Sequence, residues 1–417
     1  MKTELEKIND VERLLKVTFE WNEVQGDYEQ LVMNLRKNFK LDGFRPGKVP
    51  VSIAKKHLAA RIQYEFINTM IEKTFDEAVK DTGILDYIGS SLEDVSFEEN
   101  KPLTYDIKIE VDPEIVLPDY KKGLSVQKKE YIIEERDIQQ YIDAVIKERA
   151  EIEKVSGTIE SGYFVTVDLV NDQGSRQEDI KWEVGTTPLD GDVEKAFIGK
   201  KAGDEFKVVL TIKNKSSENT VFIKNVEKHL YPEINDEWVK TNLETVDTLE
   251  AWKKQIYDSI AKEMGDRAKY EFEQNIKNWF RDNIKVTLPK ARIENYLENM
   301  VTQFNYQRGG KSNINPADIK HFYRPQAEES VRWFLIEEKI KEDEGLDVTS
   351  EDFEAKIDEM LALYPEDQKD SFRNIYKQEN YRKQLELQIL SEKIFAHINE
   401  FVKVEIEKVK LSDLTQN

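Results

Sequence analysis

The sequence predicts an α+β multidomain fold, with an N-terminal α+β domain, a small antiparallel β domain and an elongated all-α C-terminal domain. Apolar and polar residues alternate in two separate regions, as they do in half-buried strands. From Tyr231 onward, apolar residues instead recur every three or four positions, which is the spacing of one helix face. Prolines and glycines mark the boundaries, which we place at 1–113, 114–155, 156–230 and 231–417.

The composition excludes several classes of protein. Among 417 residues the acids outnumber the bases 83 to 62, a net charge of −21, so the molecule as a whole should be repelled by nucleic acid and by anionic membranes. The chain has no cysteine, which excludes disulfides, thiolate metal sites and a thiol nucleophile. It has no apolar run of about 18 residues that could span a membrane, and its polar N-terminus lacks the apolar core of a secretory signal. We therefore expect a soluble, cytoplasmic protein with no membrane partner.

Enzyme signatures are missing as well. The four histidines, His57, His229, His321 and His397, stand singly, with no second histidine at a ligand spacing. The chain has no glycine-rich dinucleotide or phosphate loop and no serine-hydrolase motif. Carboxylates are so abundant that no acid pair is informative. We expect no catalytic residue, no metal site and no cofactor.

The first domain combines strands and helices. Alternation over residues 15–21 predicts a strand, and Asp27 is a candidate N-cap for the helix that follows. A loop rich in glycine and proline occupies residues 43–50, and a long helix is predicted from residue 52 to about residue 81. Alternation returns over residues 103–111, which predicts a further strand of the same small sheet.

The middle of the chain changes composition twice. The segment 114–155 is a linker in which residues 131–152 predict an amphipathic helix, with Ile138 and Ile142 on its apolar side. Short alternating runs around 165–169 and 206–212, separated by glycines, then predict the small antiparallel β domain.

The last region shows helical spacing almost throughout. Pro289 restarts a helix, and Thr349 with Asp352 three residues later resembles a capping box. Trp252, Ile256 and Ile260 begin an apolar stripe of the kind that recurs along the region. Stripes of this kind predict packed helices.

One stretch reverses the sign of the charge. Between Arg36 and Arg61 there are eight bases and one acid, Asp42, a local charge of +7 in a chain of −21. In its middle, Phe44 stands beside Arg45, where the ring can stack or wedge while the guanidinium meets a phosphate or carboxylate. Two prolines stiffen the loop and lower the entropy lost on binding. The pattern indicates docking to an anionic partner, although a solvated helix–loop–helix face would show the same charge.

The same loop resembles the docking signature of bacterial trigger factor, a family of ribosome-associated chaperones. Its sequence, Gly43-Phe44-Arg45-Pro46-Gly47-Lys48-Val49-Pro50, matches every fixed position of glycine-phenylalanine-arginine-any-glycine-lysine-any-proline. Three further runs resemble the family in the expected order, namely a closing strand at 105–114, a turn and strand at 199–206 and a helical entry at 231–239.

This resemblance implies a function and its partners. The chain would bind the ribosome, both exit-tunnel protein and rRNA, and would hold unfolded nascent polypeptides without ATP to assist their folding. The resemblance leaves open a homodimer of the free protein. It implies a ribosome-binding site made of Gly43, Phe44, Arg45, Pro46, Gly47, Lys48 and Pro50.

The middle domain of that family is of the FKBP type, which isomerises X–Pro bonds in an apolar, aromatic-walled pocket. This sequence departs from the pattern. The run 189–193 carries two aspartates where the pocket should be apolar, the flap is short at 213–219, and only Trp182 and Phe222 remain as candidate pocket aromatics. We expect the fold without an intact isomerase site; an active FKBP-type peptidyl-prolyl isomerase with chaperone activity is the alternative.

Client contacts are expected in the helical region and the linker helix rather than in the β domain, because aromatics and methionines stand there between charged residues. A ribosome- or RNA-associated scaffold without chaperone work is a third alternative, which predicts that the helices bury all of their apolar stripes among themselves. The candidate client contacts are Met300, Phe304, Tyr306, Phe322, Tyr323, Trp333 and Met360.

Overall fold

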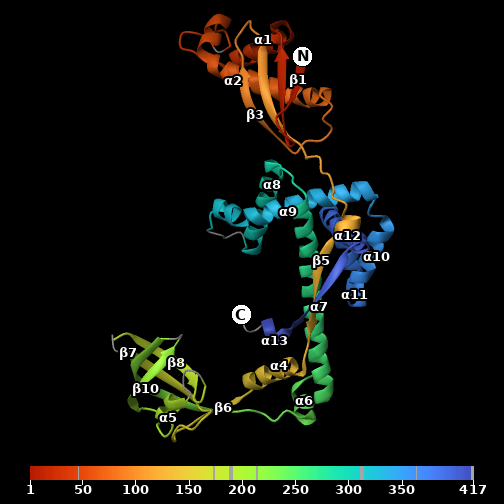
Figure 1. The fold of residues 1–417 in the computed structure, drawn as a ribbon. Helices are drawn as coiled ribbons and strands as arrows, with labels where there is room; N and C mark the ends of the chain where they lie inside the picture. Colours follow the sequence, from red (N-terminus) through yellow and green to blue (C-terminus); the bar gives the residue numbers. More distant parts are fainter. Residues whose placement is uncertain are drawn as a thin grey trace. The chain divides into compact units, whose positions relative to one another are not determined.

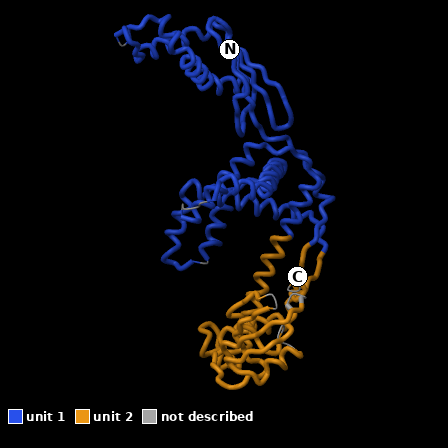
Figure 2. The backbone as a smooth tube through the Cα atoms, turned by 90° about the vertical axis from the view of Figure 1, so that its left-hand side faces the viewer, with its two compact units in different colours: residues 1–127, 272–405 blue, residues 128–271, 406–417 orange. Residues whose placement is uncertain are grey.

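The computed structural model describes residues 1–45, 47–171, 174–186, 191–212, 215–309, 314–362 and 364–414. The chain divides into two compact units, which Figure 2 shows in different colours. Unit 1 consists of residues 1–127 and 272–405, and unit 2 consists of residues 128–271 and 406–417. Residues 128–271 are thus inserted between the two halves of unit 1.

The N-terminal part of unit 1 is a four-stranded antiparallel sheet with two helices on one face (Figure 1). Its elements are β1 Lys2–Lys7, β2 Glu12–Phe19, α1 Trp21–Asn38, α2 Val51–Asp81, β3 Gly89–Ser96 and β4 Leu103–Glu110. The strand order is β1-β2-β4-β3, and every second side chain of β4 is buried against the helices. The predicted long helix and the second predicted strand are confirmed as α2 and β4.

The first helix starts earlier than the sequence pattern predicted. α1 begins at Trp21, so Asp27 is an interior residue and not the N-cap. The N-cap is Glu20, whose backbone N–H donates to the carboxylate of Glu23 at 2.8 Å, while its own side chain meets the N–H of Glu23. Because this capping box satisfies N–H groups of the first turn, the helix begins directly after β2 and carries Gly26 inside it.

The C-terminal part of unit 1 is built mainly from helices. Its elements are α3 Tyr120–Gly123, the second half of α7 Leu249–Asn283, α8 Lys290–Gln307, α9 Pro316–Glu344, α10 Ser350–Leu361, α11 Glu366–Ile375 and α12 Glu379–Asn399. α10 begins with the predicted capping box, in which Thr349 and Asp352 bond reciprocally. Ile115 and Leu124 of the linker are buried in the same core as Phe280 of α7.

Tyr120 fixes the linker in this helical core. Its hydroxyl donates to the Glu344 carboxylate at 3.1 Å and lies 3.2 Å from Nε2 of His397. Its ring centroid is 5.5 Å from that of Phe280. Burial and the hydrogen bond to Glu344 raise the pKa of the Tyr120 hydroxyl, so it stays a donor at neutral pH.

A two-stranded sheet accompanies these helices. β5 (Ser125–Ile132) pairs with β11 (Lys403–Lys410), and α13 (Leu411–Leu414) follows β11. The predicted linker helix over 131–152 is therefore shorter, because β5 occupies its first residues and α4 spans Glu135–Glu148. The helical prediction holds for α7 to α12, whereas β11 is a strand that the pattern did not reveal.

Unit 2 contains a helical part and a β domain. In the helical part, α4, α6 (Asp236–Asn242) and the first half of α7 share a core that includes Ile142, Val239 and Trp252.

The β domain is a five-stranded antiparallel sheet of order β6-β10-β7-β8, with β9 also paired to β10. Its elements are β6 Glu151–Lys154, β7 Phe164–Asn171, β8 Arg176–Glu183, α5 Gly191–Phe197, β9 Glu205–Ile212 and β10 Lys215–Leu230. Val165 and Val167 of β7 pack with Val221 of β10 and Phe197 of α5. The two alternating runs predicted here are confirmed as β7 and β9.

Glu337 of α9 is a half-buried carboxylate between helices of unit 1. Oγ of Ser391 on α12 donates to it at 2.7 Å. Desolvation raises the pKa of Glu337 more than this hydrogen bond and the nearby Lys277 lower it. The ionised form of Glu337 is therefore less favourable in the folded protein than in the unfolded chain.

We expect Glu337→Gln to raise the thermal unfolding midpoint at pH 8 and to have a much smaller effect at about pH 4, where the carboxyl is largely protonated in both states. The wild type loses stability as pH rises from the pKa of Glu337 in the unfolded chain to its higher pKa in the folded protein. The variant does not lose this stability, because the glutamine amide cannot ionise. Melting curves of the wild type and the variant between these two pH values test this expectation. Glu342→Gln, on the exposed side of the same helix, is the control. A midpoint difference that does not vary with pH would contradict the assignment.

Candidate functional site

The loop over residues 43–50 joins α1 to α2 through two consecutive turns. The N–H of Phe44 donates to the carbonyl of Leu41 at 3.0 Å, and the N–H of Lys48 donates to the carbonyl of Arg45 at 2.9 Å. The third residue of each turn is a glycine with positive φ, +86° at Gly43 and +74° at Gly47. Because an L side chain rarely adopts that conformation, the two glycines of the motif are required by the turns themselves.

The loop buries one side chain and exposes others. Val49 is 1% exposed, whereas Phe44 is 40% exposed and Arg45 and Lys48 are exposed. Pro50 is the N-cap of α2. Pro46, predicted as part of the same site, lies outside the described residues. The buried valine anchors the loop, and the anchored loop presents the phenyl ring and two cations to solvent.

Most cations around this loop have no ion-pair partner among the residues that the structure describes. Lys55 pairs with Glu99, and Arg61 pairs with Glu65 at 2.7 Å. Within the described residues the other six bases of the stretch form no ion pair, and Nε of Arg36 is buried without a hydrogen-bond partner. A partner with negative charge would therefore meet cations that no acid in the described part of this domain neutralises. These six bases are Arg36, Lys37, Lys40, Arg45, Lys48 and Lys56.

The β domain places its two candidate pocket aromatics at half-buried positions. Trp182 of β8 packs against the core of the domain, and Phe222 of β10 is half-buried. Asp192 is exposed and pairs with Lys195 at 2.7 Å. Residues 189, 190, 213 and 214, which belong to the predicted pocket run and flap, lie outside the described residues.

Asp168 of β7 is a buried carboxylate that the sequence analysis did not single out. It is 3% exposed and accepts hydrogen bonds from the N–H of Asp179 at 2.9 Å and from Arg176 at 2.8 Å, with Nζ of Lys224 at 3.4 Å. The hydrogen bond from the Asp179 backbone, followed by that from Arg176, lowers the pKa of Asp168. Asp179 has a positive φ of 56° beside an irregularity in the β7–β8 register. The carboxylate therefore holds this irregular part of β8; no sequence signal marked it, because Asp168 stands between the inward-facing Val167 and Leu169, at a position where alternation predicts exposure.

The candidate client contacts fall into three groups by exposure. Tyr306 of α8 and Phe322 of α9 are exposed, at 86% and 76%. Met300, Phe304, Tyr323 and Met360 are half-buried.

Trp333 belongs to the third group, because it is a core residue. Its ring is 5.4 Å from that of Phe395 in a stacked arrangement and 5.9 Å from that of Phe280. Its position on α9 faces α7 and α12, so this candidate is buried in the core and is not presented to solvent in this structure.

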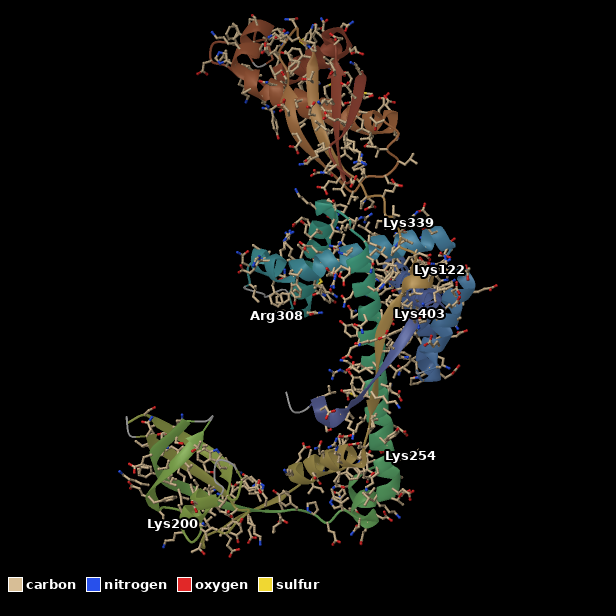
Figure 3. All side chains as sticks on the ribbon, in the orientation of Figure 1. Lys122, Lys200, Lys254, Arg308, Lys339 and Lys403 are labelled. Atoms are coloured by element: carbon tan, nitrogen blue, oxygen red, sulfur yellow. The ribbon has the colours of Figure 1, made fainter. Side chains whose placement is uncertain are left out.

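α8 and α9 form a hairpin that carries six of the seven candidates, including the buried Trp333. Lys320 of α9 pairs with Glu294 at 3.3 Å and with Glu298 at 3.5 Å on α8. Arg324, one turn later on α9, pairs with Glu294 again, as expected for antiparallel helices. Arg308, labelled in Figure 3 at the end of α8, lies 4.6 Å over the ring of Phe304. Met360 lies apart from this hairpin, on α10.

A second group of aromatics, in and beside α11, was missed. The rings of Tyr364 and Phe372 are 4.6 Å apart, and those of Phe372 and Tyr376 are 5.2 Å apart. Tyr364 and the neighbouring Ile375 are 42% and 41% exposed. Aromatics at positions i and i+4 of a polar stretch were the available signal, since such a pair lies on one helix face.

Comparison with known proteins places these features in a family. A model described as bacterial trigger factor protein matches residues 1–145, and a model of the C-terminus of the same protein matches residues 248–400. Together the two matches cover most of the chain, and the interval between them holds the β domain.

Complete relatives show the same similarity. The chain is 27% identical to a trigger factor of Halothermothrix orenii over 387 residues, covering 86% of this chain and 90% of the relative. It is 26% identical to a trigger factor of Chlorobaculum tepidum over 409 residues, covering 95% of each. A solved structure reported as "Promiscuous Substrate Recognition in Folding and Assembly Activities of the Trigger Factor Chaperone" aligns with a TM-score of 0.48 at 19% identity, covering 95% of this chain and 99% of that chain.

The fold and the matched regions define a multidomain chaperone. The chain belongs to the trigger factor family. Along the described part of the chain, no helix has the length and apolar character needed to cross a membrane.

We expect Asp168→Asn to lower the unfolding midpoint of the β domain at pH 7, because the amide cannot pair with Arg176 and Lys224. The lowered pKa of Asp168 stabilises the fold at pH values above about 3.9, the pKa of an aspartate in the unfolded chain. This stabilisation is lost as pH falls, so the difference in unfolding midpoint between wild type and variant should shrink below about pH 4.

Glu178→Gln is the matched control for this measurement, since Glu178 also pairs with Arg176, at 2.8 Å, but is exposed. Equal effects of the two substitutions would show that the buried carboxylate has no special role in holding β8.

Proposed function

We propose that this chaperone docks to the ribosome through its 43–50 loop and holds unfolded nascent polypeptides without ATP. The observation that carries the proposal is the exposed Phe44, which projects from a fixed loop among cations that have no partner in the described residues. The proposal places its action in the cytoplasm, where ribosomes are.

The loop is suited to bind a surface of protein and rRNA. Two turns and a buried valine hold its backbone, so little conformational entropy is lost on binding. The unpaired cations can meet phosphates, while the rest of the chain carries a net negative charge that opposes general nucleic-acid binding. This combination favours one oriented contact rather than scattered adsorption.

Replacing Phe44, Arg45 and Lys48 together with alanine should abolish co-sedimentation with ribosomes and leave the far-UV spectrum unchanged, because all three side chains are exposed. Binding of the wild type should weaken as salt rises, since charges are screened over about 10 Å at 0.1 M.

The matched control removes one aromatic and two cations from another exposed surface, namely Tyr257, Lys254 and Lys262 of α7. This variant should sediment with ribosomes like the wild type. If the loop variant still sediments, or if both variants fail equally, the docking proposal is wrong.

We assign client binding to the helical part, with the α8–α9 hairpin as its main surface. Exposed Tyr306 and Phe322 stand among charged residues there, which suits weak and broad contact with unfolded chains. A scaffold without chaperone work would bury such side chains, so their exposure favours the chaperone proposal. Contacts of this kind hold a flexible chain at about micromolar strength, roughly −8 kcal/mol, because ordering the client offsets much of the contact energy.

The double substitution Tyr306→Ser and Phe322→Ser should reduce suppression of aggregation of an unfolded client several-fold without lowering the melting temperature, since neither side chain is buried. Light scattering during dilution of a denatured client measures the effect. Tyr64→Ser with Tyr270→Ser is the control, since these tyrosines are 69% and 63% exposed on other helices. Unchanged suppression by the hairpin variant would move client binding elsewhere.

A further inference from the structure

The helix α7 belongs to both compact units. The boundary between the units falls after Glu271, inside a helix that spans Leu249–Asn283 (Figures 1 and 2). On the N-terminal side, Trp252 and Ile256 are buried with α4 and α6 in unit 2. On the C-terminal side, the helix enters the core of unit 1, where Phe280 is fully buried. The two ends of α7 are therefore held by different cores.

The stretch between these two cores has little packing. In this fully described stretch no side chain between Ile260 and Ala268 is buried, and only Ala261 and Met264 are half-buried. Backbone hydrogen bonds within the helix are thus the main force that keeps it straight there.

Contact with a neighbouring strand begins at the C-terminal end of this stretch. Arg267 lies 5.6 Å over the ring of Tyr131 in β5, whose hydroxyl donates to Glu271 at 2.9 Å. Nδ2 of Asn275 donates to the carbonyl of Gln127, also in β5, at 2.9 Å. β5 therefore braces α7 from Asn275 back to Arg267.

A glycine lies in the unbraced stretch. A Cβ at Gly265 would meet no atom within 4 Å in the described structure, and the residue has no positive φ. Neither packing nor backbone conformation therefore requires glycine at this position. What glycine does contribute is weaker helix formation, by about fivefold relative to alanine.

We propose that Gly265 is a flexible joint at which α7 bends, so that the helical core around Trp252 and Ile256 reorients relative to the core around Phe280 while both cores stay intact. The joint combines the residue least favourable to helix, apart from proline, with a stretch of α7 in which no side chain is buried. Bending here requires opening only a few backbone hydrogen bonds in an exposed segment and breaks no buried contact. The inference concerns the conformation of the chain and does not depend on the proposed ribosome docking.

The test compares Gly265→Ala with the wild type by two measurements. Hydrogen exchange of the amides around residue 265 should slow by about fivefold in the variant, because alanine disfavours local opening. Distances between spin labels at Gln140→Cys on α4 and Glu342→Cys on α9 should show a narrower distribution in the variant. The chain has no cysteine of its own, so these two thiols are the only labelled sites.

Gly26→Ala is the matched control, because Gly26 is also an exposed helical glycine whose Cβ would meet nothing within 4 Å. α1 packs on the sheet on either side of it, through Val24 and Tyr28, so this substitution should raise stability and leave the distance distribution unchanged. Slower exchange around residue 265 with an unchanged distribution would overturn the proposal, as would exchange that does not slow at all. Narrowing by both substitutions would overturn it too.

Discussion

Burial of the linker in the helical core of unit 1 is the interaction on which the rest of the chain depends. Ile115, Tyr120 and Leu124 follow the N-terminal sheet directly and are buried among α7, α9 and α12. The core thus consists of residues from both sides of the insert 128–271. Because it is closed by those flanking segments, the insert can keep separate cores for its helices and its β domain without contributing to unit 1.

The pairing of charges also differs between parts of the chain. In the β domain and the helices, acids are matched with bases at short range, and the buried Asp168 shows how strongly such a carboxylate is held when cations and a backbone N–H converge on it. Around the 43–50 loop, Lys55 and Arg61 have acidic partners, whereas the other six bases form no ion pair with any described residue. Exposed ion pairs contribute little to stability, so leaving these cations unpaired costs the fold little while it keeps them available to a partner.

The sequence predicted the bounds of an element well where a periodic apolar pattern ended at residues that terminate a helix or a strand. α2 and β4 were predicted nearly to the residue because each has a long stripe of buried side chains. α1 was misplaced because a glycine next to Asp27 resembled a helix start, whereas the effective cap is a glutamate pair that also suits a strand end. Trp333 shows a different limit: helical spacing shows that a residue shares a face with its neighbours, but not whether another helix covers that face.

β11 was the element hardest to predict, and its position has a consequence for how the chain folds. Its partner β5 is far away in sequence, and Oγ of Ser125 meets the carbonyl of Lys403 across 278 residues. Contacts between residues so distant along the chain form late in folding, because closing a long loop costs conformational entropy before the contacts can stabilise it. During synthesis β5 leaves the ribosome long before β11 exists, whereas both cores of the insert are complete within residues 128–271. The inserted part therefore finishes folding while the unit that contains the N-terminus is still waiting for the last strand of the chain.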